Sequence, residues 1–479
     1  MRGDDHLVFS NLVFLYVFFP IVLILYFCAP RFLKNSVLLI ASLFFYAWGE
    51  PTYVFLMLFS ILINYGYGIW IESSHHKPTR KLVILWFAIV INIALLGYFK
   101  YANFFVDLIN STLHTNIHLE PIPLPIGISF YTFHALSYLI DVYRKTENAQ
   151  RNLFNLALYI TFFPQLVAGP IIRYNSVAEQ LKKRIFSSTQ FAEGIKRFVL
   201  GLSKKTLIAN TLGSTADKIF ALSSGDLTTG TAWLGIICYT LQIYFDFSGY
   251  SDMAIGLGKM FGFEFQENFN YPYIARSASE FWRRWHISLG RWFRDYLYIP
   301  LGGNRVSHWR VYVNLLIVWT VTGFWHGASW TFMAWGFYYG FIMCMEKAFL
   351  EKWLHSLWRP LQHIYLLVIV MVGWVFFRAD NFGYSFNYIK TMFFMEGQAY
   401  NDTTLLFLVD NAVYLVVGLL LCAPLFPYLR MKLEELASRS LLVRYFKEIS
   451  GSIMYVGLLL LVTMYLVNST YNPFIYFRF

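Results

Sequence analysis

Long apolar runs, which follow one another along the chain, most constrain what this sequence can fold into. A hydrocarbon core about 30 Å thick is crossed by a helix of about 20 apolar residues. The cleanest runs of about this length are Leu12–Pro30, Thr52–Ile71, Leu82–Tyr98, Leu361–Phe377, Thr404–Pro424 and Ile453–Val467. We therefore expect an all-α polytopic membrane protein.

Further apolar stretches contain Gly, Pro and polar residues that a lipid-facing helix would avoid. They are Leu124–Tyr143, Leu156–Ile172, Ala232–Phe261 and Val311–Met345. Such segments are tolerated at membrane depth where they are buried in protein or line a cavity. No linker or repeat divides the chain, so we expect a single domain over residues 1–479, with about ten or eleven spans and additional re-entrant or interfacial helices.

Charge is scarce and mostly basic. Of 479 residues, 57% are hydrophobic and only 14% are charged, whereas a soluble domain carries about a quarter charged residues. The net charge of +11 comes from short stretches between the apolar runs, namely His75–Lys81, Lys182–Arg184, Lys196–Lys205, Arg276–Arg310 and Lys347–Arg359. Short loops of this kind stay on the cytoplasmic side. Their scatter argues against a nucleic-acid partner and favours lipid headgroups and a phosphorylated cytosolic substrate.

Polar residues are concentrated in the middle third of the chain. Between Leu241 and Tyr339 the sequence is crowded with Gly, Asp, Arg, Trp and His, whereas both flanks are plain apolar helices. Polar groups at membrane depth are costly and mark a cavity or pathway. We therefore expect the catalytic core at about residues 241–340. Asp246 and Asp252 lie inside an apolar segment there, and we expect ion pairs or hydrogen bonds that shape the site, in preference to a direct part in catalysis.

A basic helix is predicted within this core. Ser277 and Glu280 form a capping-box pattern, which predicts a helix that continues to about Ile299. One face of that helix carries Arg283, Arg284, Arg291 and Arg294, and the other face is aromatic. Two interpretations stay open. The arginines either anchor an interfacial helix by snorkelling, or they hold the phosphates of coenzyme A at the cytosolic mouth.

Two histidines stand in apolar surroundings. His286 falls on the apolar side of the predicted helix, and His326 lies in a stretch, 311–345, that has no other Asp, Glu, Lys, Arg or His. Alone, a histidine in an apolar helix is more often a packing residue than a catalytic one. Gly323 and Gly327, one helical turn apart, would let another backbone or a narrow substrate approach closely. The two histidines are far apart in sequence and lack neighbouring carboxylates or thiols at ligand spacing, so no metal is expected.

Short motifs rich in Gly, Pro and aromatic residues occur along nearly the whole chain. They are GYFKYAN at 97–103, LPIGISF at 124–130, FPQLVAGP at 163–170, YFDFSGYSD at 244–252, ENFNYPY at 267–273, EFWRRWHIS at 280–288, RDYLY at 294–298, LGGNR at 301–305 and FWHG at 324–327. A single Trp-His-Gly would be a weak signal, but this ordered set is highly specific. It resembles the bacterial membrane-bound O-acyltransferases, and among them the alginate O-acetylase type.

The resemblance implies a fold and roles for particular residues. It implies a ring of tilted helices around a central funnel, with a tunnel that links the two membrane faces. His326 matches the catalytic histidine of the family, and His286 matches the second histidine at the tunnel. Tyr339 stands where relatives often have another histidine, which puts in doubt an accessory role for that position.

The chemistry of acyl transfer fits these histidines. An unassisted hydroxyl is a weak nucleophile near neutral pH, so transfer to it needs a general base. Neutral imidazole suits that role, and burial favours the neutral form. We expect His326 to be the base, and His286 either to orient the acceptor or to donate a hydrogen bond to the thioester carbonyl. Acetyl-CoA is the expected donor, because seven arginines between positions 276 and 310 face only two carboxylates.

The chain ends in a short aromatic tail, residues 468–479, which contains Asn472–Phe479 with the sequence NPFIYFRF. By composition it is typical of an interfacial aromatic belt. Similar endings occur on proteins of the resembling family or on small companion proteins, which implies that Tyr476 carries the acyl group outward. A phenol, with a pKa of about 10, is closer to a thiol than a sugar hydroxyl is, so an acetyl-tyrosine ester keeps much of the reactivity of a thioester.

These features predict a bacterial inner-membrane O-acyltransferase. It would take acetyl from cytosolic acetyl-CoA and pass it across the membrane for O-acetylation of an exported cell-surface polysaccharide, alginate-like or peptidoglycan. The resemblance also implies an extracytoplasmic partner protein that completes the transfer. Two alternatives stay open: a transporter of lipid or saccharide, in which broken helices and intramembrane charges are also normal, and a catalytically silent scaffold of a polysaccharide secretion complex.

Overall fold

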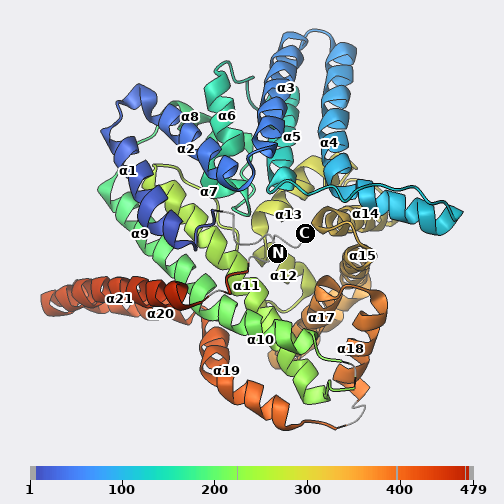
Figure 1. Ribbon diagram of the computed structural model, residues 1–479, viewed down its shortest axis with the longest axis vertical. Coiled ribbons are helices and arrows are strands. Elements are labelled where there is room, and N and C mark those ends of the chain that lie inside the picture. Colours follow the sequence, from blue (N-terminus) through green and yellow to red (C-terminus); the bar gives the residue numbers. More distant parts are fainter. Residues whose placement is uncertain (1–6, 224, 395–397, 470, 474–479) are drawn as a thin grey trace.

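The computed structural model describes residues 7–223, 225–394, 398–469 and 471–473, and these residues form helices and no strand. Two short helices, α12 (Ala278–Arg284) and α13 (Ile287–Phe293), lie near the middle of the view in Figure 1, and longer helices surround them. The expected all-α class is therefore confirmed.

Six helices in the described part of the chain are long and apolar enough to cross a membrane. They are Arg31–Gly49, which includes α2 (Lys34–Gly49), and α3 (Tyr53–Ser73), α4 (Pro78–Leu113), α17 (Arg359–Arg378), α19 (Asp402–Leu421) and α21 (Leu441–Asn468). The last five coincide with predicted runs. The run at 12–30 instead forms a shorter apolar stretch, Phe14–Cys28, that includes α1 (Phe19–Cys28). The crossing helix that begins at Arg31 was missed because its first turn is polar.

Shorter or less apolar helices complete the architecture. They are α5 (Ile128–Arg144), α6 (Leu153–Thr161), α7 (Phe163–Leu166), α8 (Tyr174–Lys182), α9 (Ser188–Ser203), α10 (Asn210–Phe220), α11 (Thr229–Met260), α14 (His308–His326), α15 (Trp330–Met345), α16 (Glu351–Ser356), α18 (Phe382–Phe394) and α20 (Leu425–Arg439). Most of α11 is buried. The interrupted apolar stretch Ala232–Phe261 therefore corresponds to a helix buried in the protein, as expected.

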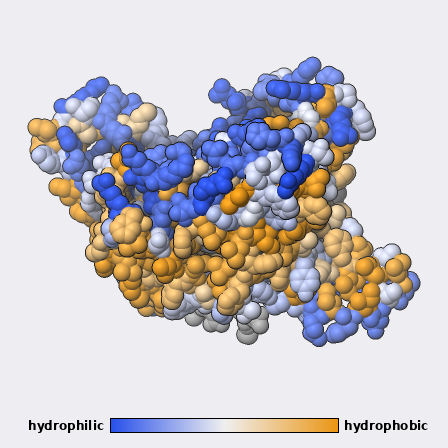
Figure 2. All heavy atoms as spheres, turned by 90° about the horizontal axis from the view of Figure 1, so that it is seen from above, coloured by the Kyte–Doolittle hydropathy of each residue, from blue (hydrophilic) through white to orange (hydrophobic). Residues whose placement is uncertain are grey.

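The outer surface carries many large hydrophobic side chains. Ile24, Phe55 and Val409, for example, are 63%, 70% and 73% exposed. Figure 2 shows a broad apolar zone along the side of the molecule, with hydrophilic residues along one edge of it. Soluble proteins rarely expose apolar patches of such extent. This zone is the lipid-facing surface of a multi-pass membrane protein.

The helices α9 and α11 run antiparallel and touch at two pairs of glycines. A Cβ atom added to Gly194 would lie 2.7 Å from the carbonyl oxygen of Gly256, and one added to Gly201 would lie 2.5 Å from that of Gly249. Small residues at such positions let two helix backbones approach closely. The spacing of seven residues on each helix keeps both pairs on one shared line of contact.

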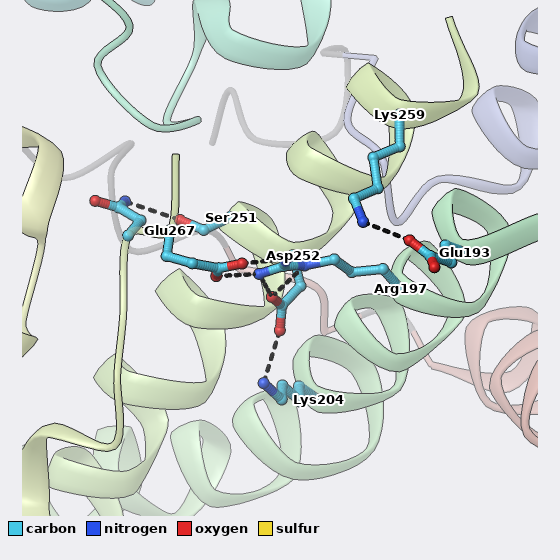
Figure 3. A network of polar contacts seen from close by, with 8 residues as sticks. Glu193, Arg197, Lys204, Ser251, Asp252, Lys259 and Glu267 are labelled. Atoms are coloured by element: carbon cyan, nitrogen blue, oxygen red, sulfur yellow. Dashed lines mark hydrogen bonds and ion pairs between the residues drawn. The ribbon is translucent and has the colours of Figure 1, made fainter. Parts of the chain in front are cut away.

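Ion pairs follow the same line of contact (Figure 3). Lys259 on α11 pairs with Glu193 on α9 at 2.8 Å. Asp252 pairs with Arg197 at 2.8 Å and with Lys204 at 2.7 Å. An intramembrane carboxylate is costly unless it is paired, so these contacts explain how α11 accommodates Asp252. They confirm the expectation that this residue forms ion pairs.

We predict that Gly201→Ala destabilises the fold, because the added methyl group would meet backbone atoms of α11 that cannot move aside independently. A loss of about 1–3 kcal/mol in the free energy of unfolding is expected for such overpacking, measured as a lower midpoint of thermal unfolding in lipid nanodiscs. Gly457→Ala is the matched control, since a Cβ atom there meets nothing within 4 Å. Equal midpoints for the two variants would contradict the proposed close contact.

Candidate active site

His286 lies at a break between α12 and α13. Its backbone is left-handed, with φ of 44° and ψ of 53°, a conformation that L-residues other than Asn, Asp and Gly rarely adopt. The segment 268–270 satisfies backbone groups on both sides of the break, since the amide of Asn270 donates to Arg284 O at 2.9 Å and the amide of Ile287 donates to Asn268 O at 2.9 Å. The predicted continuous helix from 277 to 299 is therefore wrong.

The His286 ring is held from one side. It is 2% exposed, and it packs edge-on against Phe247 with 4.6 Å between ring centroids. Its Nδ1 lies 3.1 Å from Oδ1 of Asn268. Its Nε2 is buried and has no hydrogen-bond partner among the residues that the structure describes. One nitrogen is thus held by a hydrogen bond within the protein, and the other is not.

His326 is the last residue of α14, and its position is set by α4. The hydroxyl of Tyr101 donates to Phe324 O at 2.8 Å, and Nζ of Lys100 donates to His326 O at 3.2 Å and also to Trp325 O. A cation at a helix C-terminus satisfies carbonyls that have no partner within the helix. Lys100 and Tyr101 therefore fix the end of α14 and, with it, His326.

Aromatic rings enclose the His326 side chain. Its ring centroid lies 4.9 Å from that of Trp325, 5.1 Å from that of Trp335 and 5.3 Å from that of Phe377. The side chain is 7% exposed. The ring of Trp335 also packs against that of Trp282 on α12, with 5.5 Å between centroids. The end of α14 that carries His326 and the α12–α13 segment that carries His286 therefore meet in one aromatic cluster, although the two histidines are forty positions apart in sequence.

Close contact between α14 and α15 depends on glycine. A Cβ atom on Gly323 would lie 2.4 Å from Phe332 O, and one on Gly336 would lie 2.4 Å from Trp319 O. The expectation that Gly323 admits another backbone is confirmed. Gly327, in contrast, faces the ring of Phe332.

Several buried hydrogen-bond donors surround the histidines. Those without a partner in the described part of the chain include the indole nitrogens of Trp282, Trp325 and Trp335 and the hydroxyl of Tyr339. Tyr339 is fully buried and packs against Trp282 with 4.8 Å between centroids. A group of unpartnered donors in an apolar wall can stabilise negative charge that develops on a substrate oxygen.

The four arginines do not share one helical face, because the helix that would align them ends at Arg284 and a new one begins at Ile287. Arg284 pairs with Glu280 at 2.8 Å, and Arg294 pairs with Asp295 at 2.7 Å. Arg291 and Arg283 are exposed. Arg291 donates to Gln266 at 2.5 Å, and Arg283 forms no ion pair within the described ranges. The prediction of a shared basic face was therefore wrong, and two of the four charges are already neutralised.

Asp246 forms a second buried ion pair. Its Oδ1 lies 2.7 Å from Nζ of Lys205, and both residues are 2% exposed. Lys205 also lies 3.0 Å from Oδ1 of Asn210. The expectation that Asp246 forms an ion pair is confirmed.

The start of the C-terminal tail docks beside this ion pair. Lys205 donates to Pro473 O, and the amide of Asn210 donates to Asn472 Oδ1 at 3.1 Å. Asn472 in turn donates to Ser10 O at 3.1 Å. Residues 471–473 thus contact η3 (Lys204–Ala209), α10 and the N-terminal segment. Tyr476 lies outside the described residues.

Two residues that hold the histidines were missed by sequence reasoning. Lys100 was detectable, because a lysine directly follows an apolar run in α4 and intramembrane charges are seldom incidental. Asn268 stands in the ENFNYPY motif, but nothing in its spacing points to His286. In the described ranges, no three His, Cys, Asp or Glu side chains come together as a metal site would require.

Comparison with known proteins gives a consistent result. The model of the membrane-bound O-acyltransferase family matches residues 40–377. The chain is 47% identical over 392 residues to the "Probable alginate O-acetylase AlgI" of Azotobacter vinelandii, covering 81% of this chain and 78% of that protein. It is 35% identical over 426 residues to the "Peptidoglycan O-acetyltransferase" of Helicobacter pylori, covering 82% and 80% of the two chains.

A more distant relative carries a different acyl group in its name. The "Teichoic acid D-alanyltransferase" of Streptococcus thermophilus is 30% identical over 245 residues, which is 47% of this chain and 58% of that protein. The matched region of the family model spans most of the chain and includes both histidines, their supporting residues and the helices that carry them. This protein is a multi-pass O-acyltransferase that belongs to the membrane-bound O-acyltransferase family.

Proposed function

We propose that the protein takes acetyl from acetyl-CoA on the cytosolic side and passes it across a bacterial inner membrane for O-acetylation of an exported cell-surface polysaccharide. The observation that carries this proposal is that two buried histidines from different parts of the chain, His286 and His326, lie on segments that meet in one aromatic cluster. The names of the alginate and peptidoglycan relatives support a polysaccharide acceptor.

In the proposed reaction, His326 acts as general base. Its imidazole takes the proton of the acceptor hydroxyl while the hydroxyl oxygen bonds to the acyl carbon. The carbon–sulfur bond of the thioester then breaks, and the coenzyme A thiolate leaves with the proton from the imidazolium. The unpartnered indole nitrogens of Trp325 and Trp335, beside the His326 ring, are candidate donors to the oxyanion.

We further propose that Tyr476 is the first acceptor of the acetyl group. The preceding residues, 471–473, are held by Asn210, Lys205 and Ser10 within the protein. These contacts hold the chain directly before the aromatic residues within the protein, and so support the relay. The acetyl-tyrosine ester would then deliver its acetyl group to an extracytoplasmic partner protein, which completes the transfer to the polymer.

For the donor, we propose that exposed arginines of α12 and α13 bind the phosphates of coenzyme A. Arg283 and Arg291 are the better candidates, since Arg284 and Arg294 are paired with carboxylates. Guanidinium groups suit phosphate because they offer several donors in a fixed geometry.

His326→Ala should reduce polymer acetylation at least about 100-fold, because the general base is lost. His286→Ala should reduce it less completely. The acetyl content of the polymer and the amount of membrane-inserted protein are measured together, with His355→Ala, an exposed histidine on α16, as control. Wild-type acetylation in both active-site variants would overturn the catalytic assignment and favour a transporter of lipid or saccharide.

Arg283→Ala combined with Arg291→Ala should raise the KM for acetyl-CoA about tenfold or more, since a hydrogen bond between charged groups contributes about 1.5–3 kcal/mol. The assay uses purified protein in lipid nanodiscs. The control removes two exposed arginines elsewhere, Arg439→Ala with Arg444→Ala, and so matches the change in net charge. An unchanged KM for acetyl-CoA in the Arg283→Ala, Arg291→Ala variant would contradict phosphate binding and favour the alternative, in which these arginines anchor the helices at the membrane interface.

Tyr476→Phe should abolish polymer acetylation while the protein level stays normal, because only the proposed nucleophilic hydroxyl is removed and the aromatic ring remains. Tyr445→Phe, which removes an exposed hydroxyl on α21, is the control. Full acetylation by Tyr476→Phe would show that the tail serves only as an anchor.

A further inference from the structure

Asn268 is the residue through which the protein holds the ring of His286. It is 1% exposed and lies in the extended segment that pairs with the break between α12 and α13. We infer that Asn268 is a positioning residue that fixes His286 as the Nδ1–H tautomer, so that Nε2 presents a lone pair to the acyl acceptor. This inference deepens the proposed function and rests on its placement of His286 in the site.

The orientation of the Asn268 amide follows from its neighbours. Its Nδ2 donates to Ser251 Oγ at 3.0 Å. Its other amide atom receives the backbone N–H of Ser288 at 3.2 Å, and an N–H can only donate. That atom is therefore the oxygen, Oδ1, and it faces Nδ1 of His286 at 3.1 Å. Only a proton on Nδ1 makes this contact a hydrogen bond.

The opposite tautomer has no comparable partner. With the proton on Nε2, the lone pair of Nδ1 would face the lone pairs of Asn268 Oδ1. The Ser288 hydroxyl does not relieve this conflict, because it lies 3.5 Å from Nδ1 but donates to Asn268 Oδ1 at 2.8 Å. The same hydroxyl oxygen accepts the backbone amide of Ile171 at 2.9 Å, so its own proton is directed elsewhere, and Asn268 Oδ1 is the nearer acceptor. The contacts of this cluster therefore favour the Nδ1–H tautomer of His286.

The ion pairs between α9 and α11 hold Asn268 in place. Arg197 donates to both Asp252 and Glu267, and Glu267 is the residue directly before Asn268. Figure 3 shows Glu267 and Asp252 meeting at the Arg197 guanidinium, with Ser251 beside them on α11. Ser251 is the acceptor of the Asn268 amide. The segment at 267–268 is thus attached to two helices before it reaches His286.

The tautomer restricts what His286 can do. A neutral ring with its proton on Nδ1 can accept a hydrogen bond at Nε2 but cannot donate one there. Of the two roles considered for His286, orientation of an acceptor hydroxyl therefore fits, and donation to the thioester carbonyl does not. The buried Nε2, with no partner in the described residues, provides the required acceptor.

The test is nitrogen NMR of the full-length protein in lipid nanodiscs, with ¹⁵N-labelled histidine. The His286 signals are assigned as those lost in His286→Gln. We expect a protonated Nδ1 and an unprotonated Nε2 at neutral pH. Asn268→Asp keeps the accepting oxygen and should keep Nδ1 protonated, whereas Asn268→Leu should not. The matched control is Asn270→Leu, an exposed asparagine two residues away.

A proton on Nε2 in the wild type, or an unchanged Nδ1–H in a folded Asn268→Leu protein, would overturn the inference. The wild-type spectrum alone decides it if Asn268→Leu does not fold. Polymer acetylation is measured in parallel and should fall about tenfold or more in Asn268→Leu, as expected for loss of a positioning partner, with at least partial rescue in Asn268→Asp. Normal acetylation in His286→Gln would refute the role of His286 in the reaction, and the spectra would still decide the tautomer.

Discussion

The antiparallel contact between α9 and α11 is the interaction on which the rest of the structure depends. Glycine pairs bring the two backbones together, and the ion pairs of Arg197, Lys204 and Asp252 fix their register. Arg197, which belongs to this contact, also forms an ion pair with Glu267 in the segment that supports His286. Lys205, the residue after Lys204, donates a hydrogen bond to Pro473 O at the start of the C-terminal tail. A shift of register would therefore displace both at once.

Elsewhere in the structure, the protein itself supplies hydrogen-bond partners for polar backbone groups, which lipid cannot do. The break at His286 would leave backbone amides and carbonyls without partners, and the extended segment 268–270 supplies several of them. Lys100 supplies donors at the end of α14. These hydrogen-bond partners come from parts of the chain that are remote in sequence. The irregular backbone of the site is therefore stable only when the helices are packed together.

Much of the fold could be predicted from the sequence, since hydropathy reports directly on membrane crossing. Five of the six crossing helices were found, and the ion pairs of Asp246 and Asp252 were expected on energetic grounds. The break at Trp285–His286 was not predicted. The capping pattern at Ser277 is present, since its hydroxyl oxygen accepts a hydrogen bond from the backbone amide of Glu280. Local helix propensity, however, does not predict where tertiary hydrogen bonds end a helix.

The candidate site was predictable to a different degree. His326 stood out as a lone ionisable group in an apolar stretch, His286 stood out by its place on the apolar side of the predicted helix, and family motifs strengthened the choice. Their supports did not stand out, because Asn268 acts through a contact across 18 positions and Lys100 through contacts across more than 200. Such contacts depend on how helices pack, which hydropathy and periodicity do not encode.

The hydrogen bonds between Ser10 and Asn472 close a separation of 462 positions along the chain. Helices can enter a bilayer one by one and associate afterwards, but a contact of this range forms only when the last helix is in place. The N-terminal segment can therefore form its hydrogen bonds with Asn472 only after nearly all of the remaining chain has been synthesised. A chain halted before α21 therefore lacks the hydrogen bonds that join its N-terminal segment to residue 472.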